Sequence, residues 1–223
     1  MTLSPRASQF IGWTRGTTLI KEARPLRDWL SQAGLPLYPA ILDFQETLAG
    51  VEYYLPSGIA VHWSLEHVDE ADQAFALWRE PDGSVLFPCT YCEGSPMPFY
   101  LGTVGTLYTA DRVLIAIASS AAKAIESDAM LDEMVRTGSA WTSFTLSEQE
   151  RSEGFLRAIR EFEPIEEVAE ASDEYTHWWR GDGWYLCQRV SWDSSSHRFT
   201  VFGRAKMRAD AQRLVQRVGG IIL

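Results

Sequence analysis

The sequence has few cysteines, no long apolar run and no apolar leader. Only three of its 223 residues are cysteine, which excludes a disulfide framework as the basis of the fold. The longest apolar stretch, residues 113–118, is far too short to cross a bilayer. Residues 1–6 do not lead into the apolar segment of a signal peptide, so we expect a cytoplasmic protein without membrane contact.

Motifs of the common enzyme classes are also missing from the sequence. It contains no Walker loop and no GxGxxG fingerprint, and the glycines at 102 and 105 lead into a predicted strand instead of a helix. No GxSxG elbow occurs, and the neighbourhood of Ser119 and Ser120 offers no base. We therefore expect neither catalysis nor a cofactor.

Apolar and aromatic residues are plentiful. Hydrophobic residues make up 46% of the chain, which is enough for a packed core and excludes disorder as the main state. The nine tryptophans, ten phenylalanines and eight tyrosines can each bury a large area.

The hydrophobic periodicity predicts both helices and strands. Residues 20–33 and 39–49 have helical spacing and end at Gly34 and Gly50. The period then changes to two, and the residues 81–84 (PDGS) predict a turn between two strands. Further helices are predicted from the N-cap Ser127, at 147–162 and at 209–218. Strands are predicted at 59–63, 74–78, 85–87, 99–108 (bent at its glycines), 108–118 (a hairpin), 184–192 and 199–202.

These elements predict an α+β fold, with a curved, mainly antiparallel sheet and helices packed on it. We assign residues 1–145 to a first domain and residues 146–223 to a C-terminal helix-strand-strand-helix extension. No linker rich in proline, glycine or serine separates the two parts, so we expect the extension to pack on the same core and add to the same sheet.

Charge is distributed unevenly along the chain, whose formal net charge is −10. Residues 1–145 contain 17 acids and 9 bases, residues 146–176 contain 10 and 3, and residues 177–223 contain 3 and 8. The acidic body repels phosphates, which disfavours nucleic acid as a partner, and it attracts a basic protein. The alternative is that the acidity only keeps the protein soluble.

Cys89 and Cys92 form a CxxC pair, a pattern that can hold zinc or exchange disulfides. Zinc needs four ligands, and no second pair follows at a matching spacing. Residues 94–98 have a loop composition, whereas a redox pair normally sits at a helix start. We interpret both residues as ordinary thiols, with zinc as the first alternative and redox exchange as the second.

An acidic cluster follows Trp63 within ten residues. Carboxylates beside an aromatic anchor can form a binding surface for a basic partner, and the alternative is a solvated loop. The run from Glu161 to Glu170 has the same two interpretations and a third, in which it neutralises the basic C-terminal segment. The predicted binding residues are Trp63, Glu66, Asp69, Glu70, Asp72 and Glu93.

Three segments carry a family resemblance. Residues 34–50 combine Leu35-Pro36 with an aromatic residue, Phe44 and a terminal glycine; the other segments are 99–111 and 117–131. Together they resemble the SUKH superfamily, with its SMI/KNR-type fold, over about the first 140 residues. The family's glycine pair after the second helix is Ala49-Gly50 here.

The resemblance implies an α+β fold and, for many bacterial members, an immunity protein that binds a cognate toxin, often a nuclease, and blocks it. It transfers no catalytic residues. Two alternatives remain open. One is a zinc-dependent enzyme or small-molecule binder with a non-local site formed by residues such as His62, His67, Cys92 and Glu93; the other is a regulatory scaffold of the same fold.

Overall fold

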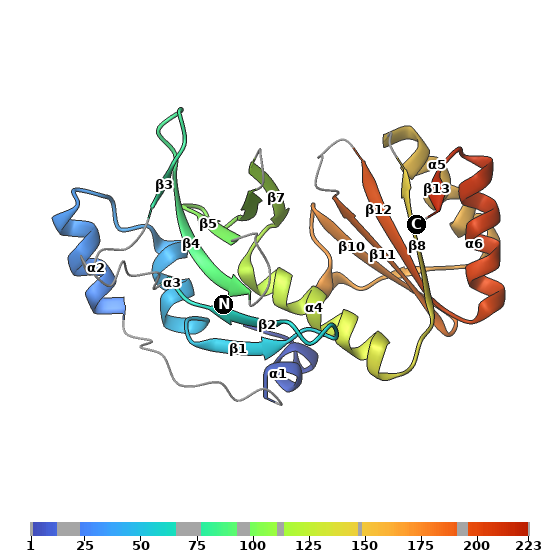
Figure 1. The fold of residues 1–223 in the computed structure, drawn as a ribbon, viewed down its shortest axis with the longest axis horizontal. Helices are drawn as coiled ribbons and strands as arrows, with labels where there is room; N and C mark the ends of the chain where they lie inside the picture. Colours follow the sequence, from blue (N-terminus) through green and yellow to red (C-terminus); the bar gives the residue numbers. More distant parts are fainter. Residues whose placement is uncertain are drawn as a thin grey trace. The chain divides into compact units, whose positions relative to one another are not determined.

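The described residues form two antiparallel sheets with helices packed on them (Figure 1), which confirms the expected α+β class. The computed structural model describes residues 2–12, 23–65, 77–92, 99–110, 114–146, 149–190 and 196–222. The chain divides into two compact units, Met1–Ala129 and Met130–Leu223, and the boundary falls inside helix α4 (Ala121–Arg136).

The first unit is built on a seven-stranded sheet in which every neighbouring pair is antiparallel. The strands have the order β1-β2-β4-β5-β6-β7, and β3 pairs with the same edge of β4 as β2 does. Besides the start of α4, its elements are α1 (Pro5–Gly12), α2 (Ala23–Gln32), α3 (Pro39–Thr47), β1 (Val51–Tyr54), β2 (Ala60–Trp63), β3 (Trp78–Arg79), β4 (Val85–Cys92), β5 (Phe99–Gly102), β6 (Leu107–Ala110) and β7 (Leu114–Ala118).

Aromatic side chains join the helices of this unit to its sheet. The ring of Phe44 on α3 lies 6.1 Å from that of Trp63, measured between centroids, and Phe10 on α1 lies 4.7 Å from Tyr53. The Tyr53 hydroxyl also donates a hydrogen bond of 2.7 Å to Asp128 on α4. The side chains of Phe44, Tyr53 and Trp63 are all fully buried. The face of the sheet that carries Tyr53 and Trp63 therefore lines the core of the unit.

The second unit has a six-stranded antiparallel sheet of its own, with the order β13-β8-β12-β11-β10-β9. Its first strand, β8, lies between two strands from much later in the sequence. Besides the end of α4, its elements are β8 (Trp141–Leu146), α5 (Gln149–Phe162), β9 (Glu166–Glu167), the 3-10 helix η1 (Ala169–Ala171), β10 (Thr176–Gly181), β11 (Trp184–Val190), β12 (His197–Gly203), α6 (Ala205–Arg217) and β13 (Ile221–Ile222).

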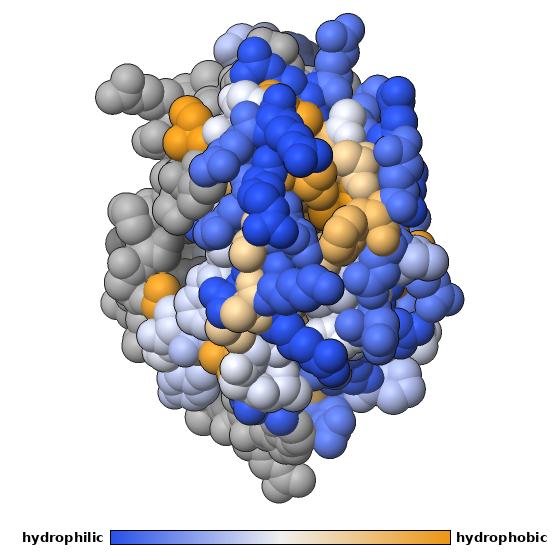
Figure 2. Space-filling model, turned by 90° about the vertical axis from the view of Figure 1, so that its right-hand side faces the viewer, coloured by the Kyte–Doolittle hydropathy of each residue, from blue (hydrophilic) through white to orange (hydrophobic). Residues whose placement is uncertain are grey.

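Both faces of this sheet bury aromatic rings. On the face covered by α5 and α6, Phe144 and Phe199 stack at 5.5 Å, and Phe155 of α5 packs edge-on against both. On the opposite face Trp178 stacks on Phe202 beside methionines of α4. The outward faces of α5 and α6 are largely hydrophilic (Figure 2).

Two local predictions from the sequence are wrong. Helix α4 begins at Ala121, where the Ser120 hydroxyl accepts the Lys123 N–H, so Ser127 lies buried inside the helix and does not cap it. Residues 99–108 do not form one bent strand. They form β5 and the start of β6, joined by a turn in which Gly105 has a φ of 100°.

The predicted attachment of the C-terminal strands to the first sheet is also wrong. Strands β8 to β13 pair only with one another in the described part of the chain, and their side chains form separate core clusters. Helix α1 and strands β1, β8 and β10 are not among the elements predicted from the sequence. The helices predicted at 39–49, 147–162 and 209–218 are confirmed as α3, α5 and α6, with shifted ends.

Candidate functional site

The hairpin of β3 and β4 is an exposed element that projects from the first unit (Figure 1). Its turn is closed by backbone hydrogen bonds from Gly83 to Glu80 (2.9 Å) and from Glu80 to Ser84 (3.0 Å). Gly83 has a φ of 86°, a left-handed conformation that a residue with a side chain adopts only at an energetic cost. The ring of Pro81 restricts the φ angle of that residue to a value that suits a turn. The turn predicted from residues 81–84 is therefore confirmed.

Asp82 keeps its charge at the tip of this turn. One carboxylate oxygen accepts the Ser84 N–H at 2.8 Å. Hydrogen bonds from Ser84, first from its backbone and then from its side chain, lower the pKa of Asp82 below the ordinary value. The tip therefore presents a fixed and fully exposed negative charge.

Trp78 supplies an aromatic surface at the base of the same hairpin. Its side chain remains 44% exposed while its ring packs edge-on against Tyr100, with 5.5 Å between centroids. The indole N–H donates to the Glu80 carboxylate. Tyr100 is buried, and burial raises the pKa of its hydroxyl, so the ring that supports Trp78 stays neutral. The orientation of Trp78 is thus set by one ring and one carboxylate.

Together these residues place an exposed indole, a carboxylate bonded to it and a second carboxylate at the tip on one hairpin. An indole face attracts Arg and Lys side chains, and carboxylates bind the same cations through charge-assisted hydrogen bonds. Trp78 and the turn were both visible in the sequence, as the end of a predicted strand and as a turn. What the sequence did not reveal is that Trp78 stays exposed.

The predicted aromatic anchor, Trp63, has a different role. Trp63 is only 1% exposed and packs against Phe44 in the core, so it cannot contact a partner. Strand β2 directs it inward because its register with β1 and β4 places Trp63 opposite Val51 and Thr90. The acidic residues predicted to accompany it, Glu66, Asp69, Glu70, Asp72 and Glu93, lie outside the described residues.

The residues of the zinc hypothesis are only partly described. The His62 imidazole lies 3.2 Å from the Glu52 carboxylate across β1 and β2, which gives it a structural partner. Cys89 is completely buried in the first core, and Cys92 ends β4. His67 and Glu93 lie outside the described residues. Within the described ranges, no three His, Cys, Asp or Glu residues are grouped so that they could hold a metal ion.

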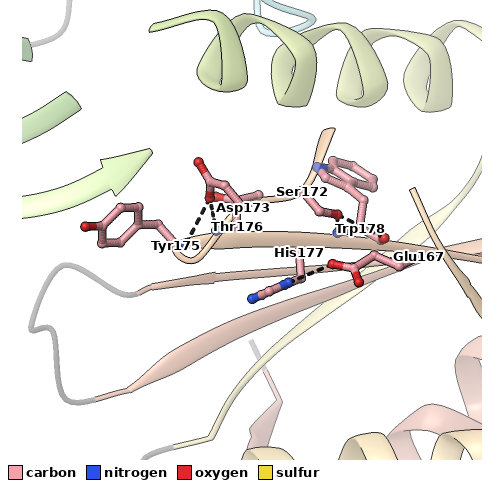
Figure 3. Close-up of polar contacts among 7 residues, drawn as sticks. All are labelled: Glu167, Ser172, Asp173, Tyr175, Thr176, His177 and Trp178. Carbon is pink, nitrogen blue, oxygen red and sulfur yellow. Dashed lines mark hydrogen bonds and ion pairs between the residues drawn. The ribbon is translucent and has the colours of Figure 1, made fainter. Parts of the chain in front are cut away.

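The acidic run before β10 is partly neutralised within its own unit. Glu166 binds Arg180 at 2.8 Å. The Glu167 carboxylate lies 3.0 Å from the His177 imidazole (Figure 3). The His177 ring also stacks on Trp179 at 5.5 Å. Since Arg180 belongs to the basic C-terminal segment, the third interpretation of this run is confirmed for Glu166.

The loop leading into β10 is held by local polar contacts (Figure 3). Asp173 accepts the backbone N–H groups of Tyr175 and Thr176, and the Ser172 hydroxyl accepts the Trp178 N–H at 2.8 Å. These bonds satisfy backbone donors and fix the loop, so they give Ser172 and Asp173 a structural role.

One serine–histidine contact occurs among the described residues of this unit. The Ser152 hydroxyl lies 3.3 Å from Nδ1 of His197. Burial, with a smaller contribution from the charge of His177, lowers the pKa of His197, so the imidazole is neutral near pH 7. Ser152 is only 1% exposed, which makes it inaccessible to a substrate in this structure, and we assign the pair a structural role.

Comparison of the chain with models of known protein families, with functionally characterised proteins and with solved structures gave no match. The resemblance to the SUKH superfamily therefore stays a prediction from the sequence. Among the described helices, none is both long and apolar enough to cross a membrane.

Proposed function

We propose that this protein binds a basic protein in the cytoplasm and covers the functional surface of that partner, as an immunity protein does with its cognate toxin. The observation that carries the proposal is the β3–β4 hairpin, which presents the exposed Trp78 beside Glu80 and carries Asp82, whose pKa is lowered by hydrogen bonds from Ser84, at its tip. An exposed tryptophan is a frequent energetic centre of a protein interface. The protein acts by occlusion and transforms no substrate.

The charge of the first unit supports a basic partner. Residues 1–129 contain 15 acids and 8 bases, so the unit around the hairpin is strongly negative. Such a field accelerates encounter with a positively charged protein and suppresses encounter with acidic ones. If the toxin is a nuclease, the carboxylates of the hairpin would take the place of substrate phosphates in its basic cleft. The sequence resemblance to immunity proteins is consistent with this role.

The experiment is co-expression with the toxin encoded next to the gene for this protein. We expect rescue of growth and a complex that survives purification. In the variant Trp78→Ala/Glu80→Gln/Asp82→Asn, both should be lost because the anchor and both charges are removed. The matched control is Trp141→Ala/Asp28→Asn/Glu46→Gln, which removes the same residue types at other exposed positions.

Absence of a complex with the unaltered protein would refute the proposed function. Equal loss of binding in the two triple variants would leave a toxin-binding protein but would remove the hairpin as its contact site. Circular dichroism of each variant separates both results from a folding defect.

A further inference from the structure

Helix α6 of the second unit presents a row of basic side chains in an otherwise acidic protein. It contains four bases and one acid, Asp210. Lys206, Arg213 and Arg217 lie at positions i, i+7 and i+11, which places them along one stripe of the helix. All three are exposed. These three side chains form a positive ridge on α6, although the net charge of the whole chain is −10.

The single acid of α6 offsets one charge of the ridge and leaves two. Asp210 is 7% exposed, and one of its oxygens accepts a hydrogen bond from Arg213. Lys206 and Arg217 form no ion pair with any described residue. Their charges are therefore available to a partner.

Apolar side chains lie next to the ridge. Leu214 and Val218 are only partly buried where they pack against the second core, one turn apart along the next row of the helix. Figure 2 shows apolar atoms between hydrophilic columns on this face of the unit.

From this combination we propose that the face formed by α6 and the adjacent side of α5 binds an acidic amphipathic helix of a partner protein. The apolar face of such a helix would cover Leu214 and Val218, and its carboxylates would pair with Lys206 and Arg217. Charge complementarity selects an acidic partner, and the apolar row selects an amphipathic helix over a purely polar chain. This site is separate in sequence and in charge from the hairpin of the first unit.

Two other occupants fit the face less well. Nucleic acid phosphates would pair with the bases but would leave the apolar row uncovered. An anionic membrane requires large apolar side chains on the outward side of the helix, whereas the exposed positions of α6 hold Lys, Arg, Gln and Ala.

The experiment measures fluorescence anisotropy of a labelled helical peptide with Leu at i, i+3, i+4 and i+7 and Glu at most other positions. We expect saturable binding that weakens as salt rises. The variant Lys206→Glu/Arg217→Glu should bind about tenfold more weakly, as the loss of two ion pairs at a partly desolvated site implies. The variant Arg24→Glu/Arg27→Glu makes the same change in net charge on α2 and should bind like the unaltered protein.

Four results would overturn the proposal. The first is no binding of the peptide, or equal binding of a scrambled peptide of the same composition. The second is equal weakening in both double variants, which would show that binding depends only on net charge. The third is binding of a labelled oligothymidylate in preference to the peptide, which would make this face a phosphate-binding surface. The fourth is self-association through the same face, measured by sedimentation velocity of the protein alone.

Discussion

Trp78 packs edge-on against Tyr100 with 5.5 Å between ring centroids, although the two residues differ sharply in exposure. Tyr100 is 7% exposed and belongs to the sheet, whereas Trp78 is 44% exposed on a two-stranded extension of it. A contact of this kind orients an exposed ring at little cost to the fold.

The Trp78→Ala substitution should therefore lower the free energy of unfolding by about 1 kcal/mol, the worth of one aromatic pair at a half-exposed site. Urea unfolding followed by circular dichroism measures this. The Tyr100→Ala substitution should lower it more, by about 3 kcal/mol, because it opens a buried site. If Trp78→Ala proved the more damaging of the two, Trp78 would be part of the core.

Two glycines of the second unit should respond in opposite directions to alanine. A Cβ atom at Gly181 would lie 2.1 Å from Nε1 of the buried Trp184, so Gly181→Ala should lower the free energy of unfolding by about 1–3 kcal/mol. Gly154 lies inside α5 with no neighbour within 4 Å of an added Cβ, so Gly154→Ala should raise it by about 1 kcal/mol. Thermal unfolding of the two variants gives the comparison. A stabilised Gly181→Ala variant would contradict the close packing of Trp184 against Gly181, and a destabilised Gly154→Ala variant would contradict the open space around Gly154.

His197 should make the second unit less stable in mild acid. Burial and the charge of His177 lower its pKa in the folded state, so the unfolded chain takes up the proton first as pH falls. The contribution of His197 to stability is therefore complete above its ordinary pKa near 6.5 and declines as pH falls through that value, levelling off below the folded pKa.

Urea unfolding between pH 5 and pH 8 tests this dependence. In His197→Asn the decline should become shallower. In the control His62→Asn it should persist, since His197 is intact. An unchanged pH profile in His197→Asn would remove the residue as its cause.

Thr90 should tolerate loss of its hydroxyl. The side chain is 1% exposed, and its oxygen has no hydrogen-bond partner among the described residues. Valine has nearly the same shape, so Thr90→Val should leave the free energy of unfolding unchanged or raise it by about 1 kcal/mol. Thr200→Val should instead lower it by about 1 kcal/mol, because Thr200 bonds to Ser143 at 3.0 Å. A destabilised Thr90→Val variant would indicate that the hydroxyl is satisfied by bound water.

The features that the sequence predicted correctly depend on nearby residues. The turn at residues 81–84 follows from the backbone preferences of Pro81 and Gly83 alone, and α3 from its own periodicity. Whether Trp63 or Trp78 reaches the surface depends on pairing with β4, which lies elsewhere in the chain. Local patterns do not encode that register.

The start of α4 was misplaced for a related reason. Ser120 and Ser127 are both suitable N-caps, and choosing between them requires knowing that Ala121 and Ile125 pack into the first core. Strand β10 was missed because its consecutive tryptophans, Trp178 and Trp179, are both buried, on opposite faces of the sheet. Such a strand has no alternation of polar and apolar residues to detect.

The position of β8 in the second sheet has a consequence for synthesis of the chain. Thr142 pairs with Val201, and Thr145 pairs with Ile221 on its other side, so both neighbours of β8 are made long after it. While the ribosome translates the intervening residues, β8 has neither sheet partner, and Phe144 can be covered only by nearby α5, through Phe155. The second sheet is therefore completed only late in translation. Until β12 and β13 are made, both backbone edges of β8 lack their strand partners.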